Sequence, residues 1–148
     1  MKLTQSIEIA CPPERVFAFL SDPGNLPRWQ SSVEQVRRES PSPGVGARHV
    51  EVRSLLGRAV EQTLEMTAYE PPTRLDLAVI DGPLKLRVSH TLAPTPGGTL
   101  LEVVGEGEIG GPLRLLEPVL VAAVKAQGEQ DLARLREVLE EGSLSPRA

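Results

Sequence analysis

Polar and hydrophobic residues alternate along the N-terminal end of the chain. Residues 2–9 read KLTQSIEI, with mostly apolar side chains at the odd positions and polar ones at the even positions. A period of two is typical of a strand with one buried face, so the pattern predicts a first β-strand here. Pro12 and Pro13 end it and can also begin a helix, because proline is tolerated in the first helical turn. Apolar residues at helical spacing then predict a short helix to about Leu20 and a second short turn over residues 26–30.

Strand-like segments separated by glycine, proline, asparagine and aspartate occupy the middle of the chain. They cover residues 33–39, 48–55, 59–69, 75–80, 84–92 and 99–104. Asp81-Gly82 is a strong signal for a tight hairpin, and Gly57 indicates another. Because short turns join consecutive segments, they predict an antiparallel meander, with about seven strands when the first one is included.

The C-terminal part of the chain changes to a helical period. From Pro112 to about residue 140, apolar residues recur at the spacing of one helix face. They are Leu116, Leu120, Val124, Leu132, Leu135 and Leu139. Pro118 should kink this helix or mark the start of its regular part, and Gly142 is a suitable stop. Residues 143–148 are predicted to form a flexible tail.

The apolar faces of these elements decide how they pack. Alternate strand positions carry leucine, valine and methionine on one face and charged residues on the other. A one-sided sheet needs one apolar cover, and the C-terminal helix is the only long one available. The sequence therefore predicts the α+β class, with a curved antiparallel sheet wrapped around the long C-terminal helix in a single domain over residues 1–142.

Composition narrows the classes of function. The 148-residue chain has a net charge of −4 and one cysteine, so we expect neither a basic nucleic-acid surface nor an internal disulfide. Apolar segments are too short for stable membrane insertion, and no secretion signal is visible, so we expect a cytoplasmic protein. Without a Cys/His cluster or HExxH motif, we expect no metal site and no cofactor. The oligomeric state stays open.

Three features have plain structural explanations. Residues 105–110 match GxGxxG, but a dinucleotide site needs a second parallel strand and only helix follows. We expect these glycines to let the last strand turn and approach the helix closely. Cys11 begins a helix, but with no histidine nearby in sequence a packed, unreactive thiol is favoured. His49 falls on the opposite strand face from Val50 and Val52, so we expect it outside.

Several segments together resemble a known family. They are residues 10–17 (ACPPERVF), 20–22 (LSD), 26–29 (LPRW), 44–46 (GVG), 69–75 (YEPPTRL), 97–99 (GGT) and 131–135 (DLARL). With them the chain resembles the polyketide cyclase/dehydrase-like members of the superfamily of START domains and birch-pollen-type allergens. The resemblance covers nearly the whole chain and implies the helix-grip fold, with two short helices after the first strand. Because this superfamily uses one cavity for lipids, sterols, hormones and polyketides, the fold does not settle the function.

Two functions of different classes are compatible with this resemblance. The first is a module that binds a hydrophobic small molecule, such as a lipid, a quinone or a polyketide-like compound. The alternative is a cyclase or dehydratase in which His90 and Gln62 position a polarised carbonyl; a third possibility is a structural protein whose groove is too full to bind anything. An enzyme acting on enolates should show several inward acids, bases or donors. Inward strand positions are mostly apolar, so the sequence favours binding.

The candidate site residues come from the strand faces and the helix stripe assigned inward. His90 shares a face with Leu86 and Val88 and is the candidate catalytic residue, with a hydrogen-bonded core histidine as the alternative. Trp29 either lines the mouth of the cavity or anchors its loop. The predicted ligand-binding set is Trp29, Gln62, Leu64, Met66, Leu77, Leu86, Val88, His90, Leu120, Val124 and Gln127.

Overall fold

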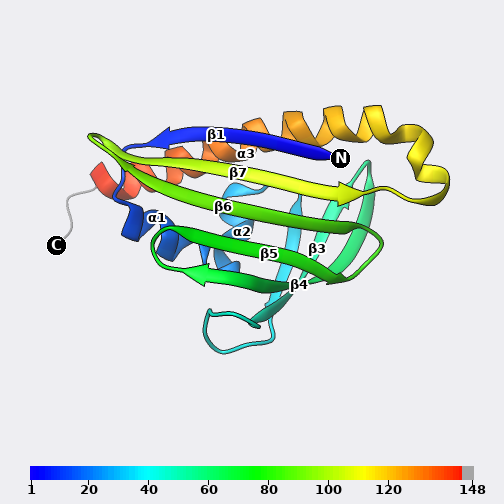
Figure 1. Ribbon diagram of the computed structural model, residues 1–148, viewed down its shortest axis with the longest axis horizontal. Helices are drawn as coiled ribbons and strands as arrows, with labels where there is room; N and C mark the ends of the chain where they lie inside the picture. Colours follow the sequence, from blue (N-terminus) through cyan, green and yellow to red (C-terminus); the bar gives the residue numbers. More distant parts are fainter. Residues whose placement is uncertain (145–148) are drawn as a thin grey trace.

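The structure is a computed structural model that describes residues 1–144 (Figure 1). Its strands are β1 (Lys2–Ile9), β2 (Val33–Arg38), β3 (Arg48–Leu55), β4 (Arg58–Glu70), β5 (Arg74–Asp81), β6 (Lys85–Thr95) and β7 (Gly98–Glu108). Its helices are α1 (Pro13–Leu20), α2 (Leu26–Trp29) and α3 (Glu117–Leu144), and 3-10 turns form η1 (Pro23–Asn25) and η2 (Gly111–Leu116). These elements confirm the predicted order of strand, two short helices, strands and long helix.

All strands belong to one antiparallel sheet with the order β1-β7-β6-β5-β4-β3-β2. Strands β2 to β7 form the predicted meander, and β1 pairs with β7, so that Leu3 lies opposite Gly105. Two register shifts interrupt the pairing of β4 with β5, and such bulges bend and twist a strand. The sheet curves, and α3 runs alongside β1 (Figure 1). The α+β helix-grip arrangement is therefore confirmed.

The apolar stripe of α3 packs inward over most of its length. Leu120, Leu132, Leu135 and Leu139 are all buried. The prediction for Leu116 is wrong, because this residue belongs to η2 and its side chain is 44% exposed. A 3-10 turn has three residues per turn, so the helical spacing that selected Leu116 does not apply there.

The ends of α3 test the predictions made for Pro118 and Gly142. Pro118 lies in the first turn of α3 and marks the start of the regular helix. The helix continues to Leu144, so Gly142 does not end it as predicted. The rest of the predicted tail, residues 145–148, lies outside the described residues. Within residues 1–144, no helix is both long enough and apolar enough to cross a membrane.

Two of the motifs also find their places in the fold. Cys11 is buried in the core cluster, and burial raises the pKa of its thiol, as expected of a packed cysteine. Gly107 makes a close approach, but to β6 and not to α3: an added Cβ would lie 2.7 Å from the Lys85 carbonyl oxygen. Gly107 therefore allows close packing of β7 against β6, and the predicted close approach to the helix was wrong for this glycine.

Candidate functional site

A pocket of about 310 Å³ lies between the inner face of the sheet and α3. Its apolar wall comes from strands β4, β6 and β7 and from one side of α3. The main apolar contributors are Leu64, Leu86, Val88, Val103, Val124 and Leu132. This volume is at the lower end of the range for small-molecule sites, which are typically apolar with a few placed polar groups.

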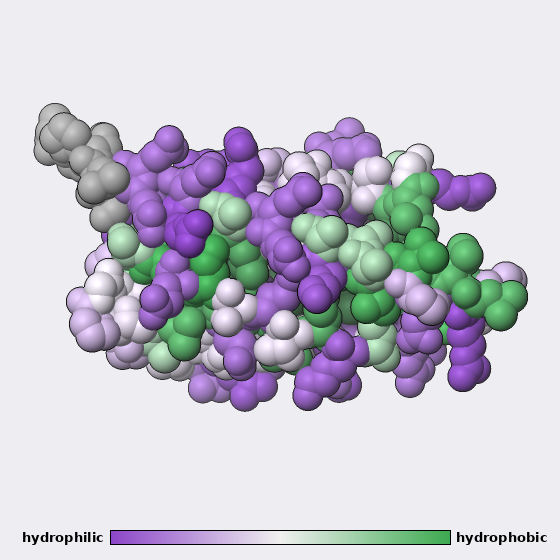
Figure 2. Space-filling view, turned by 90° about the horizontal axis from the view of Figure 1, so that it is seen from above, coloured by the Kyte–Doolittle hydropathy of each residue, from purple (hydrophilic) through white to green (hydrophobic). Residues whose placement is uncertain are grey.

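The pocket opens beside the turn between β3 and β4. Leu56 in this turn and Val124 on α3 both line the pocket, yet they are 53% and 37% exposed. Exposed apolar side chains continue from there over η2 and the start of α3, at Leu115, Leu116 and Val119. Figure 2 shows hydrophobic residues gathered at this end of the molecule.

Most of the predicted binding residues line this one pocket. They are Trp29, Gln62, Leu64, Leu86, Val88, His90, Val124 and Gln127. Met66, Leu77 and Leu120 are not among the lining residues. Leu77 packs against the hydrophobic core, and Leu120 on α3 is buried, with 4% exposure. Met66 pairs through its backbone with Ala47 and faces a different pocket beside α1.

Strand β3 places charged residues inside the molecule, which the sequence did not predict. His49 is 2% exposed and Glu51 is 1% exposed, so the expectation that His49 lies outside is wrong. His49, Glu51 and Arg53 alternate along one strand face, and Glu51 pairs in register with Gln62 of β4. Hydropathy alone assigns such residues to solvent, because the hydropathy of one residue contains no information about the polar partners that allow its burial.

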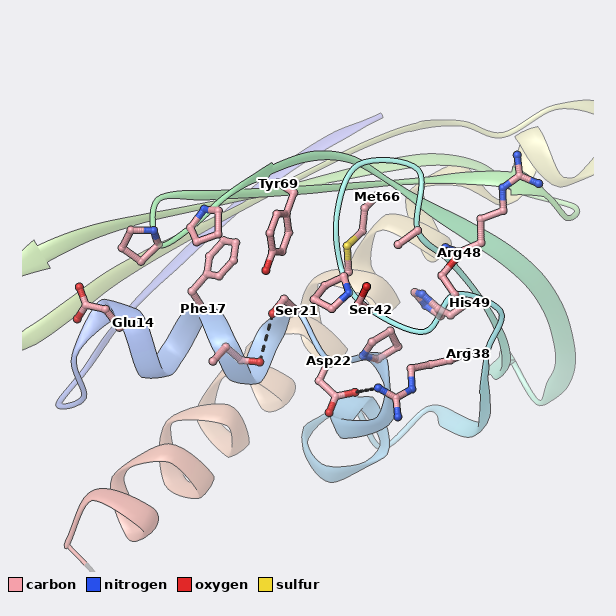
Figure 3. Close-up of a pocket in the computed structure, with 17 residues that line it drawn as sticks. Glu14, Phe17, Ser21, Asp22, Arg38, Ser42, Arg48, His49, Met66 and Tyr69 are labelled. Carbon is pink, nitrogen blue, oxygen red and sulfur yellow. Dashed lines mark hydrogen bonds and ion pairs between the residues drawn. The ribbon is translucent and has the colours of Figure 1, made fainter.

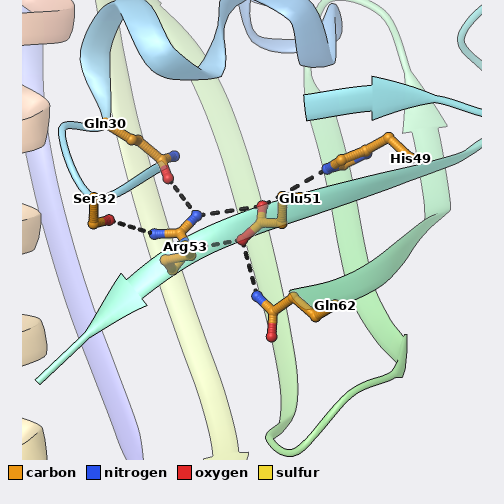
Figure 4. A network of polar contacts seen from close by, with 6 residues as sticks. All are labelled: Gln30, Ser32, His49, Glu51, Arg53 and Gln62. Atoms are coloured by element: carbon orange, nitrogen blue, oxygen red, sulfur yellow. Dashed lines mark hydrogen bonds and ion pairs between the residues drawn. The ribbon is translucent and has the colours of Figure 1, made fainter. Parts of the chain in front are cut away.

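Arg53 is the centre of this polar cluster (Figure 4). Its guanidinium donates to Glu51 Oε2 at 2.7 Å, to Gln30 Oε1 at 2.6 Å and to Ser32 Oγ at 3.1 Å. Gln62 Nε2 donates to the same Glu51 oxygen at 2.9 Å. His49 Nε2 lies 3.8 Å from Glu51 Oε1, which is an ion-pair distance and too long for a hydrogen bond.

The cluster holds Glu51 in its ionised form. Burial alone would raise the pKa of Glu51, but nearby His49, the Arg53 guanidinium and the Gln62 amide outweigh it and lower the pKa to about 2. A carboxylate this weakly basic is a poor proton acceptor at neutral pH. Its role in the pocket is therefore electrostatic and structural.

Helix α3 adds a second carboxylate across the pocket. Gln127 Nε2 donates to Asp131 Oδ1 at 2.8 Å and to Ser31 Oγ at 3.0 Å, which ties α3 to the segment after α2. Asp131 is 7% exposed, and this burial raises the pKa of its carboxyl despite the hydrogen bond from Gln127 and the charge of Arg53. Two carboxyls and one guanidinium therefore border the same pocket.

His90 lies inward on β6, as predicted, and is 6% exposed. Its Nδ1 is 3.0 Å from the Leu75 carbonyl oxygen. A carbonyl can only accept, so Nδ1 carries the hydrogen and Nε2 is left as an acceptor in the neutral ring. Burial lowers the pKa of His90, although the Leu75 carbonyl and Asp76 oppose this shift, so the ring favours its neutral form.

A second pocket of about 480 Å³ lies between α1, the connection from β2 to β3 and the turn after β4 (Figure 3). Phe17 and Tyr69 meet edge to face there, with ring centroids 5.3 Å apart. Both of its arginines form ion pairs: Arg38 with Asp22 at 3.3 Å, and Arg48 with Glu65 at 2.9 Å. Each pocket has one buried polar atom without a hydrogen-bond partner among the described residues, His49 Nε2 here and Gln62 Oε1 beneath α3. The pocket beneath α3 is the stronger candidate because its wall is mainly apolar and it contains most of the predicted binding residues.

The described residues contain no group of three or more histidine, cysteine or acidic side chains placed to hold a metal ion. The polar cluster instead consists of one ion pair with amide and hydroxyl partners. The sequence held a signal for it. Residues 49, 51 and 53 lie on one face of their strand, and a check of cross-strand partners would have placed Glu51 beside Gln62.

Comparisons with known proteins agree with this architecture. The fold and the pocket define a helix-grip protein, in which a curved sheet holds a long C-terminal helix over a central pocket. The family model described as "Polyketide cyclase / dehydrase and lipid transport" matches residues 1–140, and the chain belongs to that family. An uncharacterized protein of Mycobacterium tuberculosis (strain H37Rv) is 26% identical over 128 residues, which are 81% of this chain and 75% of the relative.

Solved structures show the same fold at low sequence identity. Protein TTHA0849 from Thermus thermophilus superposes with a TM-score of 0.85 at 20% identity, covering 97% of this chain and 99% of that one. A START superfamily protein from Mycobacterium smegmatis gives a TM-score of 0.76 at 14% identity, with coverage of 95% and 97%. These likenesses establish the fold and leave the ligand open.

Proposed function

We propose that this protein binds a hydrophobic small molecule in the pocket between the sheet and α3. The observation that supports this most is the pocket itself, with its mainly apolar wall and one buried polar cluster. The family description, which names both polyketide cyclases and lipid transport, is compatible with such a ligand. The pocket volume of about 310 Å³ argues against a groove too full to bind. A cytoplasmic location stays a prediction.

Blocking the pocket tests this proposal. Val88 lines the pocket, whereas its neighbour Arg87 lies on the outer face with a side chain that is 77% exposed. Val88→Trp should fill the space and abolish saturable binding of Nile red, a neutral apolar dye. Arg87→Trp is the matched control and should bind the dye like the wild type. Native mass spectrometry of the protein from its own host should show a co-purifying small molecule in the wild type only.

Equal dye binding by Val88→Trp and the wild type would contradict the proposal, provided that circular dichroism shows both proteins folded. That result would mean that the dye binds at another surface, such as the pocket beside α1. A loss of binding in both tryptophan variants would point to an effect of the substitution on the sheet and not on the pocket.

A second candidate function, a cyclase- or dehydratase-type reaction, is favoured by one specific observation. The pocket is bordered by a buried carboxyl whose pKa is raised, Asp131, and by a neutral imidazole, His90. A carboxyl with a raised pKa and a neutral imidazole are the usual participants in general acid–base catalysis, whereas Glu51, with a pKa of about 2, is a poor proton acceptor. An enzyme predicts that Asp131→Asn or His90→Leu loses turnover of a co-purifying compound with little loss of affinity. A binding protein predicts changed affinity and no turnover in any variant.

A further inference from the structure

One buried polar atom in the pocket has no partner. Gln62 is 5% exposed and lines the pocket, and its Nε2 donates to Glu51 Oε2 at 2.9 Å. Its Oε1 atom is buried and accepts no hydrogen bond from any described residue. Figure 4 shows this oxygen turned away from Glu51. Buried polar atoms are nearly always hydrogen-bonded, so an orphan at a pocket wall marks a place for a donor from outside the chain.

The orientation of this amide is fixed by its neighbour. Turning the Gln62 amide over would set Oε1 against the Glu51 carboxylate, and two acceptors repel. Glu51 is itself held by Arg53 at 2.7 Å, so the amide has a rigid anchor. The free acceptor is therefore a consequence of the Glu51–Arg53 pair and not an arbitrary choice of rotamer.

Among the described residues that line the pocket, Gln62 Oε1 is the fully buried polar atom without a partner. Donors are also present, since the Trp29 indole N–H has no acceptor within residues 1–144 and Gln62 and Arg53 each keep one unused N–H hydrogen. His90 uses its N–H on the Leu75 carbonyl, which leaves an acceptor nitrogen. Arg53 already donates to three side chains, and Asp131 already accepts from Gln127. The hydrogens left on Gln30 and Ser32 belong to partly exposed side chains, which water can reach.

We infer that the pocket selects apolar molecules that carry a hydroxyl or N–H donor, and that Gln62 Oε1 accepts this donor. This inference rests on the proposed function and narrows it. Molecules whose polar end only accepts, such as quinones, ketones and ethers, leave Oε1 unpaired. Ionised carboxylates are disfavoured further, because the ionised Glu51 lies beside Gln62 and already neutralises the charge of Arg53. The inference thus favours phenols and alcohols over the quinones considered from the sequence.

A matched pair of probes tests this selection. 4-Pentylphenol and 4-pentylanisole share one skeleton and differ only in that the first donates a hydrogen bond and the second cannot. Isothermal titration should show the phenol binding about tenfold more tightly to the wild type, which is the scale of one buried hydrogen bond. 4-Pentylbenzoate should bind more weakly than either.

Substitution of Gln62 assigns the effect to this residue. In Gln62→Met, which keeps the size of the side chain, the phenol and the anisole should bind about equally. Gln35→Met, at an exposed glutamine of β2, is the control and should keep the tenfold preference. If Gln62→Met does not fold, Gln62→Leu replaces it, and the preference of the wild type still tests the inference.

The outcomes separate this inference from the function on which it rests. Binding of neither probe to the wild type, together with no binding of Nile red, contradicts the proposed function. Equal binding of phenol and anisole to the wild type overturns the donor inference and leaves the binding function standing. A preference that persists in Gln62→Met also overturns it, because another group would then accept the donor.

Discussion

Arg53 illustrates how a single residue can hold charge inside an apolar pocket. Its side chain is 27% exposed, whereas that of its partner Glu51 is 2% exposed. The guanidinium thus reaches the carboxylate from the edge of the pocket and keeps contact with solvent. A buried ion pair adds little net stability, but removing one partner strands the other charge.

This asymmetry predicts the effect of Arg53→Met. The variant leaves Glu51 buried without its cation and should lose about 3–5 kcal/mol of unfolding free energy, measured by urea denaturation at pH 7. Arg48→Met is the matched control, since Arg48 forms an ion pair with Glu65 whose side chains are 53% and 26% exposed. It should lose much less. The double variant Glu51→Leu with Arg53→Met should recover part of the loss. Equal losses of unfolding free energy in Arg53→Met and Arg48→Met would refute the argument.

The fluorescence of Trp29 can report ligand binding in the pocket. It is the only tryptophan of the chain, it is 5% exposed, and it lines the pocket. Titration with 1-decanol, which does not absorb in the near ultraviolet, should therefore shift its emission in a saturable way. The midpoint should match the displacement of Nile red by the same alcohol. Displacement without any change in emission would make Trp29 only a packing anchor.

Single residues were the least predictable part of the molecule. His90 and Val88 were placed inward correctly, because their strand alternates plainly between apolar and polar positions. His49, Glu51 and Arg53 could not be placed this way, since each is polar and their burial depends on contacts with Gln30, Ser32 and Gln62. Those partners come from two other segments, the connection after α2 and strand β4, and a pattern within one strand contains no information about them.

At the scale of elements, α3 is the part that closes the pocket. Val124, Gln127 and Asp131 reach the pocket from one side of the helix, while Leu135 and Leu139 belong to the core. Helix and strand periods predicted these elements well, because each buries one continuous face. The prediction for Leu116 was wrong because the chain enters α3 through a 3-10 turn. In the sequence, the sign of that change is Pro118, two residues further on.

Adjacent residues of α3 test which face is buried. Leu120 is 4% exposed and Val119 is 57% exposed. Leu120→Asp should lose about 4 kcal/mol or more of unfolding free energy, because it removes a buried apolar side chain and introduces an unpaired charge. Val119→Asp should cost little, since its carboxylate stays in water near the helix N-terminus. Similar losses for the two variants in urea denaturation would contradict the placement of α3.

For the whole molecule, buried titratable groups make stability depend on pH. The pKa of Glu51 is lowered to about 2, so the unfolded chain takes up a proton first as the pH falls. His90 acts in the same direction from its unfolded pKa near 6.5 downward, because burial lowers its pKa in the folded protein. Asp131 acts oppositely, because its raised pKa favours the folded state at low pH. The large shift in the pKa of Glu51 should dominate in acid.

Glu51 therefore gives the pH profile of the protein a testable shape. Its contribution is fully present above the ordinary pKa of 4.5 and is lost as the pH falls to about 2. A shift of this size corresponds to about 3 kcal/mol of unfolding free energy. Glu51→Gln should be less stable than the wild type at pH 7, because Arg53 then lacks its anion, but it should lose less stability between pH 5 and pH 3. Glu102→Gln, at an exposed position of β7, is the control and should keep the wild-type profile in urea denaturation. If Glu51→Gln and the wild type lose stability in parallel over this range, Glu51 is not held ionised by the cluster, and the rigid anchor of the Gln62 acceptor is lost with it.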